Sequence, residues 1–214
     1  MHRVGEHMLT LMFERFLGRY PLPSGRPDEL WGAEPLLGIP GYADLAQQVA
    51  GLSLCGGLLR LVGAHEGRLA SVFIQEGFPE FAFRAVPFAI DWIGRVVATD
   101  QARSPGLLLI EPGSARVFEI DDSFIDFFNI DLVDDPDTFL ATDLFRDWQA
   151  AGGGIPGVDE CVGFKVPLFL GGAGAATNLE LTDLAVYWSF AAQLRERTRS
   201  LPSGTPIRER RERQ

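Results

Sequence analysis

The stretch KVPLFLGGAGAATNLE is the first candidate for chemistry, because Gly172, Gly174 and Thr177 form a GxGxxT pattern after an apolar run. Glycine turns of this kind bind nucleotide phosphates when they open a β-α-β unit with an acidic residue about 20 positions further on. Only about 40 residues follow here, and they hold one predicted helix and a charged tail. We therefore interpret the glycines as a sharp turn between a core strand and the last helix.

Nucleophilic side chains are few and do not cluster. Cys55 and Cys161 lie far apart and neither is part of a CxxC pair, while Ser53 in GLSLCG is one residue type short of a GxSxG elbow. The histidines are also scattered, at His2, His7 and His65. A hydrolase that uses Cys55 or Cys161 with His65 as the base remains an alternative, but lone cysteines usually pack as small hydrophobes. The sequence predicts no catalytic residue, no cofactor and no metal ligand, and hence a protein that is not an enzyme.

Acidic side chains are the most concentrated chemical feature. Between Glu119 and Asp147 there are ten carboxylates and one basic residue, Arg146, with aromatic residues threaded between them. In a structural interpretation the aspartates begin helices and face water. In a functional one they imitate the charge of a nucleic-acid backbone and bind a cationic cleft of another protein. The residues predicted to bind the partner are Asp121, Asp122, Asp126, Asp131, Asp134, Asp135 and Asp137.

Composition limits the class of protein. The chain has 214 residues, of which 46% are hydrophobic and 16 are phenylalanine, enough for a sizeable core without disulfides. No apolar run approaches the ~20 residues of a membrane-spanning helix, and the two cysteines suit a reducing cytoplasm. The residues before Arg195 carry 12 basic and 26 acidic groups, a formal charge of −14. Such a body repels nucleic acid and anionic lipid and attracts a basic protein partner.

The first half of the chain predicts helices followed by a meander. Residues 1–40 read as a helix and a Pro/Gly-rich linker that together form an arm, and YADLAQQVAGLSLCGGLLRLV reads as a broken helix. From Arg68 to Ile120 the apolar period changes to two, which predicts antiparallel strands. Pro112 and Gly113 stand where a type II turn requires them.

The second half predicts helices around one more strand. Residues 123–148 indicate two helices separated by DDPD, and a strand is expected over Phe164–Leu170. The last helix is expected from Thr182, with an apolar stripe of Leu184, Tyr187, Trp188, Ala191 and Leu194. Together these elements predict an α+β fold with a mostly antiparallel sheet packed against helices. We expect a helical arm over 1–40, the main domain over 41–200, and a disordered charged tail over 201–214.

Several segments together resemble a known family. GLSLCGGLLRL, PFAIDWIGRVVATD, LLLIEPGSARVFEI, ECVGFKVPLFLGG and NLELTDLAVYW occur in the order and spacing of the C-terminal domain of type VI secretion immunity proteins that neutralise a DNase effector. The resemblance runs from Ile39 to Ile207 and is most specific over Cys161–Trp188. A looser similarity joins it to SUKH-type immunity proteins. In the family a GAD-like domain precedes this one, and 40 residues are too few to supply it.

The resemblance implies a cytoplasmic protein that binds and neutralises a toxin, and it implies no chemistry. One departure is the small-residue run AGAAT at Ala173–Thr177, where the family tends to have charged residues, so a toxin that contacts this loop must differ. The alternative is an adaptor or structural subunit that uses the same domain to hold another partner. The oligomeric state stays open.

The residues that carry the resemblance also have structural interpretations. Lys165, the only lysine, is expected to pair with Asp91, Glu180 or Asp183. Asn178 and Asp183 suit turn and helix-start hydrogen bonds. The full set with expected structural roles is Asp91, Trp92, Lys165, Gly171, Gly172, Asn178, Glu180, Asp183 and Trp188.

Overall fold

The six strands of the main sheet are consecutive in the chain. The computed structural model describes residues 8–201, and its larger sheet has the order β1-β2-β3-β4-β5-β6 with every neighbouring pair antiparallel. The strands are β1 (Ser53–Leu54), β2 (Leu59–Leu61), β3 (Ala85–Asp91), β4 (Val96–Asp100), β5 (Leu107–Glu111) and β6 (Arg116–Ile120). The predicted α+β class and antiparallel meander are confirmed.

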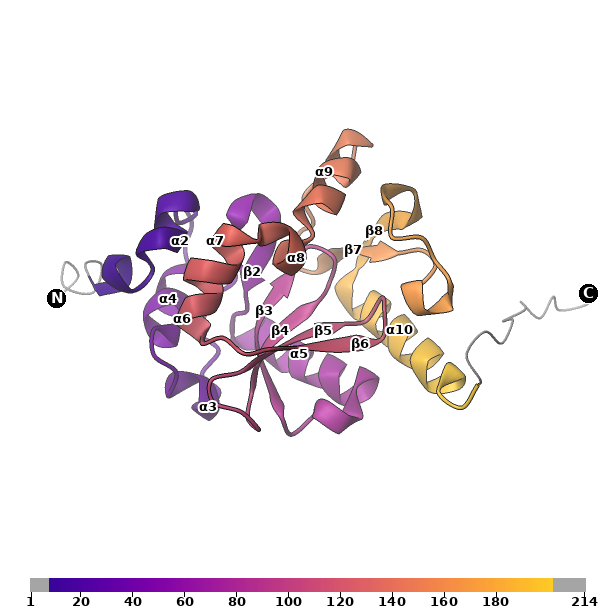
Figure 1. The fold of residues 1–214 in the computed structure, drawn as a ribbon, viewed down its shortest axis with the longest axis horizontal. Coiled ribbons are helices and arrows are strands. Elements are labelled where there is room, and N and C mark those ends of the chain that lie inside the picture. Colours follow the sequence, from indigo (N-terminus) through magenta and orange to yellow (C-terminus); the bar gives the residue numbers. More distant parts are fainter. Residues whose placement is uncertain (1–7, 202–214) are drawn as a thin grey trace, which may run out of the picture.

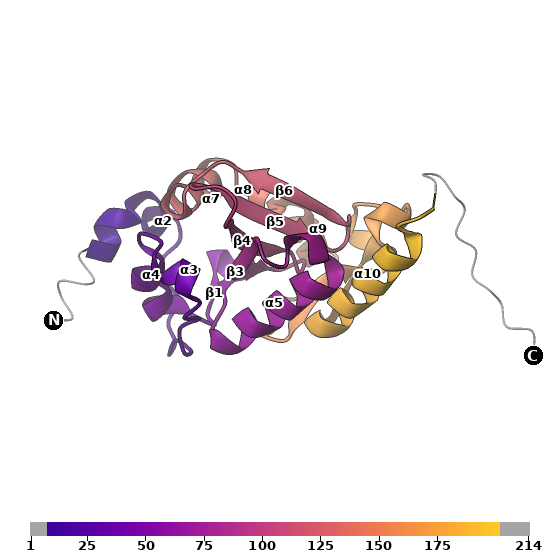
Figure 2. The ribbon, with the colours of Figure 1, turned by 90° about the horizontal axis from the view of Figure 1, so that it is seen from below.

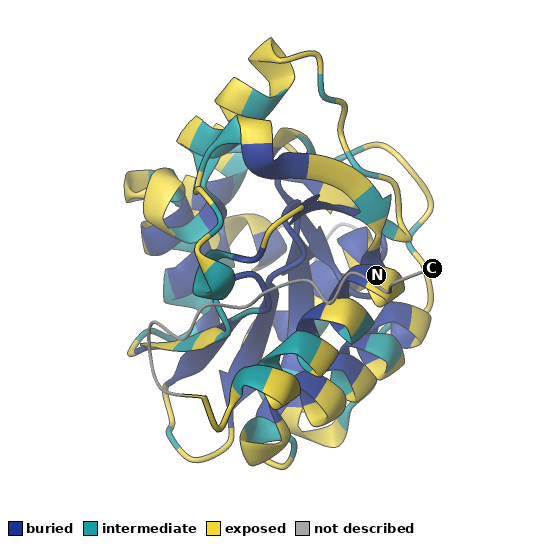
Figure 3. Ribbon diagram, turned by 90° about the vertical axis from the view of Figure 1, so that its right-hand side faces the viewer, coloured by how far each residue is buried: buried dark blue, intermediate teal, exposed yellow. Residues whose placement is uncertain are grey.

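Helices cover both faces of this sheet. On one side lie α5 (Ala64–Gly77) and α10 (Leu184–Thr198), and on the other lie α6 (Phe124–Asp126), α7 (Leu132–Asp134) and α8 (Pro136–Leu140), as Figures 1 and 2 show. Successive side chains of a strand point to opposite faces of the sheet and pack under different helices. In β5, Leu107 and Leu109 belong to one buried cluster, and Leu108 and Ile110 belong to the other. The central strands are therefore buried on both faces, whereas the helices keep an exposed outer side (Figure 3).

The N-terminal segment packs into the core, although the sequence suggested an arm. Phe13 precedes α2 (Glu14–Arg19), and Phe13 and Phe16 are fully buried in the same cluster as Phe124. Phe16 and Phe128 form an edge-to-face pair with ring centroids 4.9 Å apart. Two more helices come next: α3 (Glu34–Leu37), which lies within the predicted linker, and α4 (Tyr42–Val49). The division at residue 40 stays a prediction, and apart from Leu201 the predicted disordered tail lies outside the described residues.

Two predicted boundaries in the first half are wrong. Residues 42–62 form α4 and then the β1–β2 hairpin, because Gly51 and Gly56 adopt positive φ angles of 75° and 70° that end the helix and turn the chain. Helix α5 (Ala64–Gly77) overlaps the start of Arg68–Ile120, the stretch that was expected to form strands. The turn after β5 is not type II, since its positive φ, 56°, falls on Ala115 and not on Gly113.

In the second half, the boundaries of the helices and strands also differ from the predicted ones. Residues 124–134 form one irregular helix, in which α6 and α7 are joined by a π-helical turn, η3 (Phe127–Asp131), and α9 (Thr142–Ala150) follows α8. The sequence predicted a strand over Phe164–Leu170. In the structure the strand, β7, lies earlier, at Glu160–Phe164, and a 3₁₀ turn occupies Leu168–Leu170. Strand β7 pairs with β8 (Leu179–Asp183), which the sequence did not predict, in a separate two-stranded antiparallel sheet.

Candidate functional site

The acidic segment, defined as residues 119–147, folds mainly as short helices, and some of its aspartates make hydrogen bonds near the starts of these helices. Ser123 accepts a hydrogen bond from Asp126 N at 3.1 Å and donates one to Asp126 Oδ2 at 2.6 Å. Asp135 accepts from Thr138 N at 3.3 Å at the start of α8, and Asp137 accepts from Asp143 N at 2.7 Å near the start of α9. Of the seven candidate binding residues, Asp135 is therefore the N-cap of a helix, while Asp126 and Asp137 accept hydrogen bonds close to the starts of α6 and α9.

Aromatic residues fix the orientation of this segment. Phe124, Phe127 and Phe128 are buried against the sheet and against α2. Because they anchor the inner side, the carboxylates of Asp121, Asp134 and most neighbouring aspartates lie on the exposed side. The arrangement presents negative charge to solvent on a surface that the core holds rigidly.

Two of the candidate carboxylates already have arginine partners within the chain. Asp134 pairs with Arg15 of α2, with 2.6 Å between Oδ1 and Nη2, and this contact lowers the pKa of Asp134. Asp121 pairs with Arg103 of the β4–β5 loop. Since both pairs are at least partly exposed, they contribute little to stability, but they reduce the net charge that a partner would meet.

Asp131 differs from the other candidates. It ends the π-helical turn η3 and is only 9% exposed, yet its Oδ2 has no hydrogen-bond partner among the described residues. Burial raises its pKa to about 6, and repulsion from Asp122, Asp126 and Asp135 adds to the shift. π-Helical turns occur frequently at functional sites. A buried, unpaired carboxylate is costly to a fold and requires an explanation.

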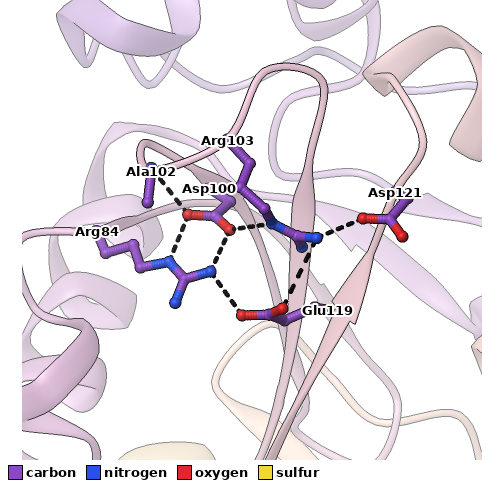
Figure 4. A network of polar contacts seen from close by, with 6 residues as sticks. All are labelled: Arg84, Asp100, Ala102, Arg103, Glu119 and Asp121. Atoms are coloured by element: carbon purple, nitrogen blue, oxygen red, sulfur yellow. Dashed lines mark hydrogen bonds and ion pairs between the residues drawn. The ribbon is translucent and has the colours of Figure 1, made fainter.

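A second polar cluster adjoins the segment. Asp100, whose side chain is fully buried, accepts two hydrogen bonds from Arg84, both 2.6 Å, and one from Arg103 at 2.9 Å (Figure 4). The hydrogen bonds from Arg84 lower the pKa of Asp100 strongly. Glu119 completes the network through Arg84 Nη2 at 2.6 Å. Sequence analysis did not identify this network, although the pairing of β3 with β4 places Asp100 opposite Ala85, next to Arg84.

A cavity of about 330 Å³ lies beside this network. It is bounded by the loop after α3, the β4–β5 loop and the start of α6. Its walls include Ile39, Pro40, Arg103, Pro105 and Phe124. Histidine and cysteine are absent from this lining, so the cavity offers no strong nucleophile or general base of those types.

The residues that carry the family resemblance have structural roles. Trp92 and Trp188 are each 1% exposed and donate their indole N–H to Leu140 O and Gly94 O, both at 2.8 Å. Asp91 is buried in an ion pair with Arg95 at 2.6 Å. Asp183 accepts from Val186 N at 2.9 Å at the start of α10. The interpretations of the tryptophans as core and of Asp183 as a helix cap agree with these contacts.

The glycine-rich bend is a turn held by Asn178. The Asn178 side chain accepts from Val166 N at 3.0 Å and donates to Val166 O and Ala173 O. Gly171 has a φ of 89°, and a Cβ on Gly172 would lie 1.8 Å from Val166 O. The bend leads through one 3₁₀ turn, η5 (Ala176–Asn178), into β8 and not into an α-helix, so the GxGxxT pattern does not have the strand-turn-helix geometry of a phosphate-binding loop.

The expected ion pair of Lys165 is not formed. Lys165 is exposed and its Nζ donates to Thr177 O at 3.2 Å, while Asp91 and Asp183 have the other partners described above. Glu180, also exposed, makes no ion pair with any described residue, although it lines a small hollow of about 180 Å³ together with Lys165, Val186 and Phe190.

The cysteines are unsuited to nucleophilic chemistry. Cys55 and Cys161 are buried in different hydrophobic clusters, and His65 is exposed. Burial raises the pKa of Cys55 to about 12 and raises that of Cys161 as well. Both are therefore neutral thiols near pH 7, and the proposed Cys-His hydrolase has no support.

The described part of the chain has neither a metal-binding cluster nor a membrane-spanning helix. Within residues 8–201 no group of three or more His, Cys, Asp or Glu side chains is placed to hold a metal ion. No helix in the same range is both long and apolar enough to cross a membrane.

Comparison with protein families finds a match in the C-terminal part of the chain. Residues 122–195 match the family described as T6SS immunity protein Tdi1, C-terminal. The match confirms the family resemblance for α6 to α9 and most of α10. The matched range is shorter than the predicted one, Ile39–Ile207. It includes most of the acidic segment. No curated protein matches the sequence.

A solved structure shares the fold. The protein described as "Crystal structure of Atu4351 from Agrobacterium tumefaciens" superimposes with a TM-score of 0.59 and 17% sequence identity. The likeness covers 85% of this chain and 88% of that one. At this sequence identity, the likeness shows a shared fold.

Proposed function

We propose, from the premise that residues 122–195 carry the C-terminal domain of type VI secretion immunity proteins, that this chain binds a toxin and neutralises it. The toxin is a basic protein, most simply a nuclease, and the acidic segment contacts its cationic cleft. The single observation that carries the proposal is that the family match includes α6 to α9, the elements on which the aspartates are concentrated.

Charge and rigidity support this mode of binding. The candidate aspartates lie on short helices anchored by buried phenylalanines, so little conformational entropy is lost when they meet a partner. A nuclease cleft that binds phosphates is lined with cations, and a fixed negative surface accelerates encounter with it. The immunity protein would then act in the cytoplasm by blocking the cleft and not by chemistry of its own.

Co-expression tests the proposal directly. The toxin gene adjacent to this one is expressed in a sensitive host with and without the immunity protein, and survival and DNA integrity are measured. We expect survival only when both are present, together with a complex that co-purifies. Continued killing beside folded, soluble immunity protein would reject the proposal.

An adaptor function is the second candidate, and one surface feature favours it. Val186 and Phe190 on α10 are 61% and 50% exposed beside Lys165, forming an apolar patch with a cation outside the acidic segment. Such a patch marks a protein-binding surface without specifying a toxin. A stable stoichiometric complex with a protein that is harmless to cells would favour this candidate.

A further inference from the structure

Strand β8 has one open edge. In the small sheet, β7 lies on one side of β8, and no described strand lies on the other. Val162 of β7 is opposite Leu181 and donates its N–H to Trp92 O at 2.8 Å, away from β8. Two residues that face each other in this way in an antiparallel pair both direct their N–H and C=O outward. Leu181 therefore presents a donor and an acceptor on the free edge, and no described residue bonds to either.

Apolar side chains lie on both faces of this edge. Leu181 is 47% exposed, on the face that also carries the buried Val162. The other face lies against α10, where Val186 and Phe190 are 61% and 50% exposed and line the small hollow together with Glu180. The strand has no proline, lysine or bulge, the features that usually prevent an edge from pairing with another chain. It is therefore a template for one more strand.

We propose that this strand is β8 of a second copy of the chain, paired antiparallel about a two-fold axis at Leu181. The two Leu181 residues then exchange both of their free main-chain hydrogen bonds, and their side chains meet on one face. Because the axis is perpendicular to the sheet, both α10 helices lie on the other face. There Val186 and Phe190 approach the same residues of the second copy.

Charge favours this register and this occupant. With the axis at Leu181, Glu180 lies opposite Thr182 of the second copy, whose hydroxyl can donate to the carboxylate. An axis at Glu180 would instead place two carboxylates opposite each other, which is unfavourable. Lys165 and Glu180, both at the hollow, make no ion pair with a described residue. The surface thus carries both signs of charge, which suits a second copy better than a strongly basic toxin.

The position of β8 keeps the acidic segments of the two copies apart. Helices α6 and α7 lie at one end of the molecule and the β7–β8 pair at the other, as Figure 1 shows. Pairing through β8 therefore leaves the aspartates of both copies open to solvent and to a toxin. The inference goes beyond the proposed function and does not depend on it, although the two together imply a complex of two copies with two toxins.

The dimer should be weak, because its contacts are limited to a five-residue strand and one side of α10. We expect a dissociation constant of about 1–100 µM. Sedimentation velocity of the full chain between about 2 and 200 µM measures it, since dimerisation depends on concentration.

Three variants locate the interface. Leu181→Pro removes the outward N–H without removing a hydrogen bond to β7. Val186→Glu places a carboxylate in the first turn of α10, where glutamate is compatible with the helix start. Val72→Glu is the matched control, at a 44% exposed valine of α5 that does not line the hollow. We expect the first two to weaken the dimer at least about tenfold and the control to change it less than about twofold. Circular dichroism checks that all three are folded.

Hydrogen exchange of the peptide that contains β8 identifies the occupant. In the wild type the Leu181 amide should exchange more slowly at about 200 µM than at about 2 µM. A wild type that stays monomeric at 200 µM overturns the inference, and so does a dimer that persists in both Leu181→Pro and Val186→Glu. If a monomeric wild type protects β8 equally at both concentrations, a segment of the same chain covers the edge. If protection requires added toxin, the toxin is the occupant. Either result rejects the second copy and leaves the proposed function standing.

Discussion

Trp188 donates its indole N–H to Gly94 O at 2.8 Å, a contact that spans 94 residues and joins α10 to the turn between β3 and β4. The indole also stacks on Phe73 of α5, with centroids 5.5 Å apart and the rings within 11° of parallel. One side chain thus ties the C-terminal helix to the six-stranded sheet and to the helix beside it.

Replacement of Trp188 should therefore destabilise the whole fold. We expect Trp188→Ala to lower the free energy of unfolding by about 3–5 kcal/mol, because a buried ring and its hydrogen bond are both lost. Urea denaturation followed by circular dichroism measures the change. Trp188→Phe keeps most of the apolar area and should cost less, so equal losses in the two variants would contradict the role assigned to the ring.

Gly172 should not tolerate a side chain, whereas Gly174 should tolerate one. A Cβ at Gly172 would meet the Val166 carbonyl at 1.8 Å, and one at Gly174 would find no heavy atom within 4 Å. We expect Gly172→Ala to lower the free energy of unfolding by about 1–3 kcal/mol and Gly174→Ala to change it by less than about 0.5 kcal/mol. Thermal denaturation of the pair checks this, and similar melting temperatures would refute the close approach.

The Asp100 network should give the protein an acid-sensitive component of stability. Because Arg84 lowers the pKa of Asp100 in the folded state, the stabilisation is present above the ordinary aspartate pKa and is lost as pH falls below it. At pH 7 we expect Asp100→Asn to lower the free energy of unfolding by about 3 kcal/mol. Urea titrations at several pH values should show this difference shrinking toward pH 3. A difference independent of pH would contradict the ionic origin of the effect.

The two thiols should be inert in the folded protein. Burial keeps Cys55 and Cys161 protonated, so a colourimetric thiol reagent at pH 8 should react with them slowly until urea unfolds the chain. After unfolding, both should react within minutes. Rapid labelling of either cysteine without denaturant would mean that it is accessible and would revive the hydrolase alternative.

Binding of the toxin should depend on ionic strength. If the exposed aspartates make the main contacts, affinity should fall at least about tenfold between 50 and 300 mM sodium chloride, chiefly through slower association. Surface plasmon resonance separates the association and dissociation rates. An affinity that salt leaves unchanged would show that the toxin binds elsewhere, and the apolar patch at Val186 and Phe190 would then be the first region to test.

Local patterns in the sequence determined much of this protein. The apolar stretches in Arg68–Ile120 were sufficient to predict most of the antiparallel meander, although its central strands are buried on both faces. The stripe from Leu184 to Ala191 predicted the buried face of α10, because residues three or four positions apart share one side of a helix. The density of aspartates between residues 119 and 147 was also visible in the sequence. What each of these carboxylates contacts was not.

Tertiary structure decided those contacts, because they join residues with no local relationship. Arg15 reaches Asp134 across 119 positions, and the folding of Phe13 and Phe16 onto Phe128 turned the expected arm into part of the core. The same packing buried Asp131 and left it without a counter-charge, while Asp137 a few residues later stayed exposed. Hydrophobic periodicity records which side of an element is buried, but only the packed chain determines the electrostatic environment of each charge.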